Sequence, residues 1–350
     1  FFIDKKVPQV KFVDRTFNCR HDHAMAIWTY IHEHDNGITN FHFEVSADLL
    51  NEKEIALINR MRPGLIQLEI GVQSANEITI REINRTMKID VLSTIVDKIK
   101  KGNNVHQHLD LIAGLPYEGY ESFGKSFDRV YKMNPEQLQL GFLKVLKGSV
   151  MHDRAQEYGI VYQDRAPYEV LSTKWLTYAE VIRLKQIEEM VEVYYNSGQF
   201  CCTMAALEQE FASPFCMYEC LAAYYDEKNA FAVSHSRIGR YEILYDFIVK
   251  TCKERSEQYM EMLTLDMYLR DNVKKRPEFL RESGVSSDEA AAFYKKEEKE
   301  RTYLKAYEGY DRRQMRKMTH LERIDGKTVL FDYKNRDPLT GNAAIYYLSE

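Results

Sequence analysis

Five segments in the first 145 residues have the pattern of β-strands, and apolar residues at helical spacing lie between them. The expected strands are 10–13, 40–46, 65–72, 105–112 and 137–145. Because strands and helices alternate along the chain, the strands can pair in parallel through helical crossovers. We therefore predict an α/β fold, a partial (βα) barrel with a parallel sheet and with its helices outside.

Two of these strands have one apolar face and one polar face. In and just after 65–72, carboxylate and amide side chains alternate with apolar ones, and 105–112 alternates in the same way. The polar members are Glu69, Gln73, His106, His108 and Asp110. A parallel strand buried on both faces is apolar throughout, and a polar group buried without a partner costs roughly a few kcal/mol. The polar faces therefore predict a chamber that holds water or a polar ligand.

Candidate binding residues lie at or near the carboxyl ends of the expected strands, where parallel sheets place their active sites. Asp14 follows the first strand, Glu44 lies late in the second, and Gln73 ends the third. Carboxylates and amides bind ribose hydroxyls or an ammonium group, and Arg85 can clamp a carboxylate with two hydrogen bonds. Gly114, after the fourth strand, permits a bulky ligand to approach the backbone closely.

The pattern changes after residue 148. Residues 146–172 look irregular, and Thr177 with Glu180 then forms a capping box that begins a helix to about residue 196. Further helices are expected at 201–226, 238–270 and 287–318. Asp-Gly at 325–326 predicts a tight β-hairpin, and 333–348 adds a further strand. We therefore divide the chain into a partial barrel at 1–148 and a mainly helical region with a terminal hairpin at 149–350.

Composition narrows the function classes. Hydrophobic residues make up 45% of the 350, so the chain can form a core, and its net charge of −5 provides no basic field for nucleic-acid binding. We see no apolar run of transmembrane length and no signal peptide, and six cysteines make no disulfide framework. These features favour a cytoplasmic protein without a membrane partner. The chain begins with Phe and without a helix cap, so we expect it to be a piece of a longer protein.

Four motifs, in order and at strand positions, resemble successive strands of a radical S-adenosylmethionine (SAM) enzyme. They are Phe-Val-Asp-Arg-Thr-Phe at 12–17, Phe-Glu at 43–44, Glu-Ile-Gly-Val-Gln-Ser at 69–74 with Arg85 beyond it, and Asp-Leu-Ile-Ala-Gly-Leu-Pro at 110–116. The order resembles the branch with oxygen-independent coproporphyrinogen oxidases and the cobalamin-dependent enzymes of the magnesium-protoporphyrin oxidative-cyclase type. The best resemblance is to a bacterial subgroup of the latter with a helical C-terminal region.

The resemblance implies a cofactor and a set of ligands. Glu44, Gln73 and Asp110 would take the polar groups of SAM and Arg85 its carboxylate. We add Glu69, Asp14 and Gly114 to the predicted site because of their places on or after the strands. SAM bound to a [4Fe–4S] cluster would be split reductively to a 5′-deoxyadenosyl radical, which abstracts hydrogen from a substrate or supports a related methyl transfer. Cobalamin would be a further cofactor, and a flavodoxin or ferredoxin the reductant. The substrate is not identified.

The chain departs from this family in one respect. Radical SAM enzymes hold their cluster through a Cys-x-x-x-Cys-x-x-Cys loop after the first strand, and no such loop occurs in the 350 residues. Cys216 and Cys220 match one interval only and lie in the helical region. We therefore expect a truncation before this loop, with the cluster ligands and a cobalamin domain upstream, and we expect the piece alone to be inactive.

Two other functions fit the same residues. His106, His108 and Asp110 on one strand face are compatible with a barrel metal hydrolase, because some such enzymes hold zinc through two histidines at this spacing. A non-catalytic binding module, whose helical region meets a partner, is the third hypothesis.

Single residues also have structural explanations. Glu69 and Gln73 can form a hydrogen-bonded pair that fills the barrel, and Asp110 can cap the turn that follows it. Asp14 can form a turn, and Arg85 can be a surface residue paired with Glu82.

Overall fold

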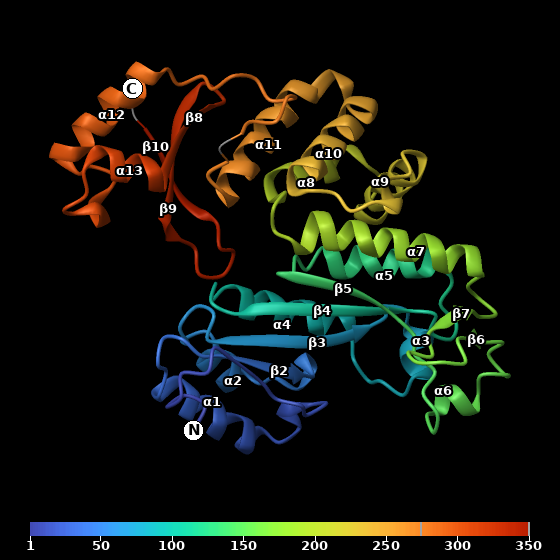
Figure 1. Ribbon diagram of the computed structural model, residues 1–350. Helices are drawn as coiled ribbons and strands as arrows, with labels where there is room; N and C mark the ends of the chain where they lie inside the picture. Colours follow the sequence, from blue (N-terminus) through green and yellow to red (C-terminus); the bar gives the residue numbers. More distant parts are fainter. Residues whose placement is uncertain (274, 349–350) are drawn as a thin grey trace. The chain divides into compact units, whose positions relative to one another are not determined.

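The computed structural model describes residues 1–273 and 275–348, which form two compact units (Figure 1). The first unit comprises Phe1–Asn196 and Phe211–Ala222, and the second comprises Ser197–Glu210 and Ala223–Glu350. The boundary that we expected at 148/149 therefore lies inside the first unit. Within the described residues, no helix combines the length and the apolar character needed to cross a membrane.

A five-stranded parallel sheet, curled into half a barrel, forms the centre of the first unit and confirms the predicted fold class. Its strands run in chain order: β1 Gln9–Lys11, β2 Asn40–Val45, β3 Ile66–Gln73, β4 His106–Ala113 and β5 Gln137–Phe142. The register sets Glu44 beside Glu69, Glu69 beside His108, and Asp110 beside Gln139. Because side chains alternate between faces, these polar residues share one face of the sheet.

Helices of the first unit bury their apolar sides together with the apolar face of the strands. They are α1 His21–Glu33, α2 Glu52–Ile58, α3 Glu77–Glu82, α4 Ile89–Lys100, α5 Tyr120–Tyr131 and α7 Tyr178–Val191. Trp28 of α1, Val96 of α4 and Phe127 of α5 are fully buried. The predicted capping box forms at Thr177–Glu180, and a second capping box forms at Asn51–Glu54. Helix α3 was not predicted, because its six residues are too few to show a helical period.

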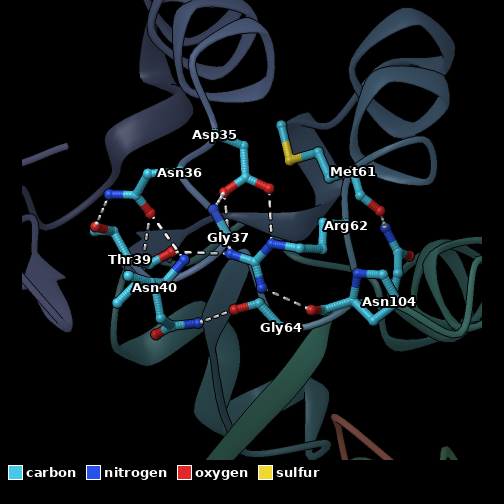
Figure 2. A network of polar contacts seen from close by, with 11 residues as sticks. Asp35, Asn36, Gly37, Thr39, Asn40, Met61, Arg62, Gly64 and Asn104 are labelled. Carbon is cyan, nitrogen blue, oxygen red and sulfur yellow. Dashed lines mark hydrogen bonds and ion pairs between the residues drawn. The ribbon is translucent and has the colours of Figure 1, made fainter. Parts of the chain in front are cut away.

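Polar contacts hold the amino ends of the strands, opposite the candidate binding residues (Figure 2). Arg62 binds Asp35 with two hydrogen bonds, Nε to Oδ2 at 2.7 Å and Nη2 to Oδ1 at 3.1 Å, and also donates to the Thr39 carbonyl oxygen. Asn40 Nδ2 donates to the Gly64 carbonyl oxygen at 2.7 Å. These contacts join the connections that enter β2 and β3, so they stabilise the sheet at the end away from the polar site.

The segment expected to be irregular contains three short elements, α6 Val150–Asp153, β6 Val161–Tyr162 and β7 Val170–Ser172, of which the two strands pair antiparallel. Val170 belongs to a buried cluster with Leu115, Val145 and Tyr158. This cluster covers the connection that follows β4.

One segment of the first unit comes from later in the chain. Helix α9, Pro214–Glu227, begins within Phe211–Ala222. The Phe215 amide nitrogen donates to Asp128 Oδ1 at 2.7 Å, and the Phe215 ring lies edge-on to the Phe127 ring, with centroids 5.6 Å apart. Gly124 leaves room for this ring, because a Cβ there would lie 2.8 Å from Phe215. The segment thus covers one side of α5.

The second unit contains helices followed by a small antiparallel sheet, as predicted. The helices are α8 Cys201–Leu207, α10 Arg237–Thr251, α11 Ser256–Arg270, α12 Ser287–Glu300 and α13 Arg312–Met318. The strands, in the order β10-β9-β8, are Ala343–Tyr347, Lys327–Arg336 and Thr319–Ile324. Asp325 and Gly326 form the predicted hairpin turn with φ values of +49° and +71°. The three long helices that we expected after residue 200 are each divided in two, into α8 and α9, α10 and α11, and α12 and α13.

Candidate functional site

A cavity of about 270 Å³ lies against the polar face of the half barrel. Five of the seven predicted site residues line it: Glu44, Glu69, Gln73, Arg85 and Asp110. These side chains come from β2, β3, β4 and the segment after α3, so residues 66 positions apart at the extremes lie around one space. The central expectation, that polar groups of neighbouring strands gather in one cavity, therefore agrees with the geometry.

Asp14 and Gly114 do not line this cavity. Asp14 is exposed in the connection after β1. Gly114 has a φ of +90°, which favours glycine, and a Cβ at this position would lie 2.8 Å from Val170 Cγ1. The close approach at Gly114 is therefore made by β7 of the same chain, whereas we had expected a ligand there.

Gln73 has a backbone conformation that is rare for a residue with a side chain. Its φ is +71°, and the Ser74 amide nitrogen donates to the Val72 carbonyl oxygen at 2.9 Å. A two-residue hydrogen bond around a positive φ defines a strained γ-turn, and such strain concentrates at functional sites. The pairing with β4 shifts register between Gly71 and Gln73. The turn directs the Gln73 amide towards Asp110, where Nε2 donates to Oδ2 at 3.2 Å.

Gly71 forms the surface on which Gln73 and Arg85 lie. Arg85 Nη1 donates to the Gly71 carbonyl oxygen at 2.7 Å. A Cβ on Gly71 would lie 2.6 Å from Gln73 Nε2 and 3.2 Å from Arg85 Nη2. The pairing of Arg85 with Glu82 that we considered is not formed, because Glu82 binds Arg154 at 2.5 Å and accepts a hydrogen bond from a tyrosine. Arg85 therefore lies in the cavity, and among the described residues its side chain has one hydrogen bond, to Gly71, so other N–H groups remain for a ligand.

The Asp110 carboxyl has a raised pKa. Burial raises the pKa of its carboxyl to about 6, although the hydrogen bond from Gln73 and the charge of Arg85 oppose the rise and the charges of Glu44 and Glu69 add to it. Three carboxylates around one small space favour a cationic guest, because each such guest reduces their mutual repulsion. Functional sites often contain carboxyl groups perturbed in this way.

Glu69 is held from the side of β1 and β2. Lys11 Nζ donates to both of its carboxylate oxygens at 2.9 Å, and His42 Nδ1 lies 3.7 Å from Oε1. Burial lowers the pKa of His42, which favours its neutral form near pH 7. The alternative that Glu69 and Gln73 pair with each other is not realised: Glu69 pairs with Lys11, and Gln73 with Asp110.

The metal-hydrolase alternative finds no support in the geometry. His108 lines the cavity with Asp110, whereas His106 does not. Burial lowers the pKa of both imidazoles. Among residues 1–273 and 275–348, no group of three or more His, Cys, Asp or Glu side chains is arranged to hold a metal ion. The buried Nε2 of His108 has no hydrogen-bond partner within the same residues.

Arg15 and Thr16 line the cavity but were not among the predicted binding residues, whereas Ser46 and Gln139 line it from the expected polar faces of the second and fifth strands. Asn18 fixes the connection after β1, because its Nδ2 donates to the Ser46 carbonyl oxygen at 2.8 Å and its Oδ1 accepts from the Ser46 amide nitrogen at 3.0 Å. Arg15 and Thr16 belong to the 12–17 motif that drew attention to Asp14. The motif therefore indicated the connection that lines the cavity. Strand alternation could not tell which of its residues do so, because β1 ends before them.

The family described as "Protein of unknown function (DUF4080)" matches residues 156–338, more than half of the 350-residue chain. The chain belongs to the DUF4080 family. The matched range includes none of the cavity residues, because the last of them, Gln139, precedes residue 156. The family model therefore matches the region that follows the half barrel.

Known enzymes are similar to part of this DUF4080 protein in sequence or in structure. Oxygen-independent coproporphyrinogen III oxidase of Salmonella typhimurium is 29% identical over 107 residues, which are 29% of this chain and 23% of that enzyme. The chain thus spans about a quarter of the length of the curated relatives that it matches. Coproporphyrinogen III oxidase (HemN) of Escherichia coli, a radical SAM enzyme, matches in structure with a TM-score of 0.34, 21% identity and coverage of 39% and 31% of the two chains.

A second solved structure with partial similarity is the radical SAM methyltransferase TsrM of Kitasatospora setae, with cobalamin and a [4Fe–4S] cluster bound. Its TM-score is 0.41 and its sequence identity 11%, with coverage of 50% of this chain and 36% of that one.

Proposed function

We propose that the first unit binds S-adenosylmethionine in the cavity of the half barrel, as part of a radical SAM enzyme. The observation that carries the proposal is the gathering of Glu44, Gln73, Arg85 and Asp110 around one space of about 270 Å³. The partial sequence similarity to oxygen-independent coproporphyrinogen III oxidase supports it. SAM carries a sulfonium, an ammonium, a carboxylate and two ribose hydroxyls, and the cavity offers a complementary group for each.

Each cavity residue has a distinct role in this proposal. Arg85 uses one nitrogen for the Gly71 carbonyl oxygen, so its remaining N–H groups can bind the carboxylate of SAM. Glu44 and the carbonyl oxygen of the Gln73 side chain accept from the ammonium group. Ionised Asp110 accepts from ribose hydroxyls, while Glu69, neutralised in part by Lys11, contributes negative charge opposite the sulfonium. These residues bind and orient SAM, and they replace water around it.

The described residues do not fit a [4Fe–4S] cluster. Of the six cysteines, Cys19 lies near β1 and the others at 201 and beyond, and no group of three among the described residues can hold a metal. We therefore derive no step through a cluster or through cobalamin. In radical SAM enzymes, reductive cleavage of SAM supplies the radical that abstracts hydrogen. Such chemistry would require three cysteine ligands from outside these 350 residues, together with a reductant such as flavodoxin or ferredoxin, and its substrate is not assigned.

Isothermal titration of the protein with SAM tests the binding. We expect Arg85→Ala to raise the dissociation constant by about tenfold or more, because a charge-assisted contact contributes roughly 1.5–3 kcal/mol. Arg81→Ala is the matched control, since Arg81 is an exposed arginine one turn earlier whose ion pair partner is Glu77. An unchanged dissociation constant is expected for this control. Absence of SAM binding by the intact, folded protein would refute the proposal.

A further inference from the structure

A buried carboxylate lies behind the strained turn at Gln73, outside the cavity. Glu118, in the connection between β4 and α5, is 1% exposed. Its Oε1 accepts two hydrogen bonds, from Ser74 Oγ at 2.7 Å and from Ser126 Oγ at 2.7 Å. Ser74 is fully buried and Ser126 is 2% exposed. Glu118 therefore contacts the residue directly after Gln73, although it does not line the cavity itself.

The two hydroxyls in turn hold the backbone on the far side of the turn. Ser126 Oγ accepts from the Ala75 amide nitrogen at 3.0 Å, and Ser74 Oγ accepts from the Asn76 amide nitrogen at 2.9 Å. A hydroxyl that donates to a carboxylate is oriented by it, so its lone pairs face these two amides. One carboxylate oxygen thereby fixes two successive backbone groups immediately after the turn.

A reason for this arrangement follows from the conformation of Gln73. A positive φ costs a residue with a side chain of order 1–3 kcal/mol, and it persists only where its surroundings impose it. Without the contacts of residues 74–76, residue 73 would relax to an extended φ. Regular pairing with β4 would then continue beyond Gly71 and Asp110 and set residue 73 beside Ile112, so its side chain would lie on the same face but two residues further along β4 than Asp110.

We propose that Glu118 is a positioning residue for Gln73, which through the hydroxyls of Ser74 and Ser126 keeps the γ-turn closed and the Gln73 amide directed at Asp110 and at the ligand. The ligand in this statement rests on the proposed SAM binding, whereas the positioning itself does not. Burial raises the pKa of Glu118, against the two hydroxyl hydrogen bonds. Its other oxygen, Oε2, is buried without a hydrogen-bond partner among the described residues.

Titration of the Asp110 carboxyl by carbon NMR tests the positioning without any ligand. The Gln73 amide lowers the pKa of Asp110, so Gln73→Ala should raise this pKa by about half a unit or more. Glu118→Ala should raise it by a similar amount, and the double variant by no more than either single variant. Glu118→Gln keeps the accepting oxygen and should restore the normal titration.

Two further variants complete the experiment. Ser122→Ala is the matched control, because this serine lies on the same helix one turn before Ser126 and accepts from Asn76 Nδ2 instead. It should leave the Asp110 titration unchanged. If Glu118→Ala does not fold, Ser74→Ala removes one of the two hydroxyls and should shift the pKa in the same direction. A foldable Glu118→Ala or Ser74→Ala protein with the normal Asp110 pKa overturns the proposal, provided that Gln73→Ala shifts it.

Titration with SAM separates the two proposals. If both proposals are correct, Glu118→Ala and Gln73→Ala should each weaken SAM binding by about fivefold or more. The double variant should then bind SAM about as weakly as either single variant. A general loss of stability would not produce this pattern, because its effect would add to that of Gln73→Ala. An intact protein that shows the Asp110 shifts but binds no SAM refutes the proposed ligand alone. Additive losses in the double variant refute the positioning.

Discussion

Gln73 donates a hydrogen bond to Asp110 across the β3–β4 boundary, with 3.2 Å between Nε2 and Oδ2. The two residues reach this contact by different means. Asp110 follows the regular alternation of β4, whereas Gln73 lies in a turn that shifts the register of β3. Because this hydrogen bond partly offsets the effect of burial, its loss should raise the pKa of Asp110 further.

The raised pKa of Asp110 predicts a pH-dependent effect on stability. The pKa is about 6 in the folded chain and 3.8 in the reference state, so ionisation of Asp110 opposes folding. This cost is absent below about pH 3.8 and complete above about pH 6. Asp110→Asn should therefore increase the free energy of unfolding by about 2–3 kcal/mol at pH 8 and leave it nearly unchanged at pH 3.5. Urea unfolding at the two pH values measures this, and an equal effect at both would contradict it.

Gly71→Ala should impair binding without unfolding the chain. The added Cβ would lie 2.6 Å from Gln73 Nε2 and 3.2 Å from Arg85 Nη2, and both are ends of flexible side chains that can move aside. We expect SAM affinity to fall about tenfold while the free energy of unfolding changes by less than about 1 kcal/mol. Titration and urea unfolding measure the two quantities. Gly239→Ala, in α10, is the control that should leave SAM affinity unchanged; alanine in a helix should only raise the free energy of unfolding, by up to about 1 kcal/mol.

Glu322 in the second unit should stabilise the fold at neutral pH. Burial opposes its ionisation, but hydrogen bonds from His320 and Arg276 and the charge of Arg276 lower its pKa to about 2, from 4.5. This stabilisation is complete above about pH 4.5 and is lost as the pH falls towards 2. Glu322→Gln should cost about 3 kcal/mol at pH 7 and progressively less below pH 4.5. Urea unfolding along a pH series measures the difference.

Glu289→Gln is the control for Glu322→Gln, because the ion pair of Glu289 with Arg323 is largely exposed. Its effect on the free energy of unfolding should be much smaller than that of Glu322→Gln. A loss at Glu322 that stays constant from pH 7 to pH 3 would show that packing, and not charge, is responsible.

Arg62→Lys should reduce stability and spare binding. The planar guanidinium of Arg62 makes two hydrogen bonds to Asp35, a geometry that an ammonium group cannot reproduce. We expect a loss of about 1–2 kcal/mol in the free energy of unfolding and an unchanged dissociation constant for SAM, because these contacts lie at the amino ends of the strands. Weaker SAM binding in a folded Arg62→Lys protein would contradict this separation.

The cavity was predictable where strand alternation is regular. Glu44, Glu69 and Asp110 lie on one face because side chains of a strand alternate strictly. The register of the neighbouring parallel strands then brings them close together. The start of α7 was predictable because a capping box marks it at Thr177.

The remaining features depend on contacts between distant parts of the chain. Gln73 shares the face of Glu69 in the sequence pattern, but its γ-turn is held by Glu118, 45 positions later. Gly114 meets Val170, which no local pattern places beside it. Arg15 reaches the cavity because Asn18 ties its connection to Ser46. Such long-range contacts leave no periodic signal in one sequence.

The return of Phe211–Ala222 to the first unit means that one cut cannot separate the two units. A protein ending at Asn196 would lack Phe215, expose the Phe127 ring and leave Asp128 without its amide donor. The shortest N-terminal piece in which Phe215 still packs against Phe127 and the rest of the first unit is kept therefore extends through Ala222. Such a piece also includes α8, because α8 lies between Asn196 and Phe211 in the chain.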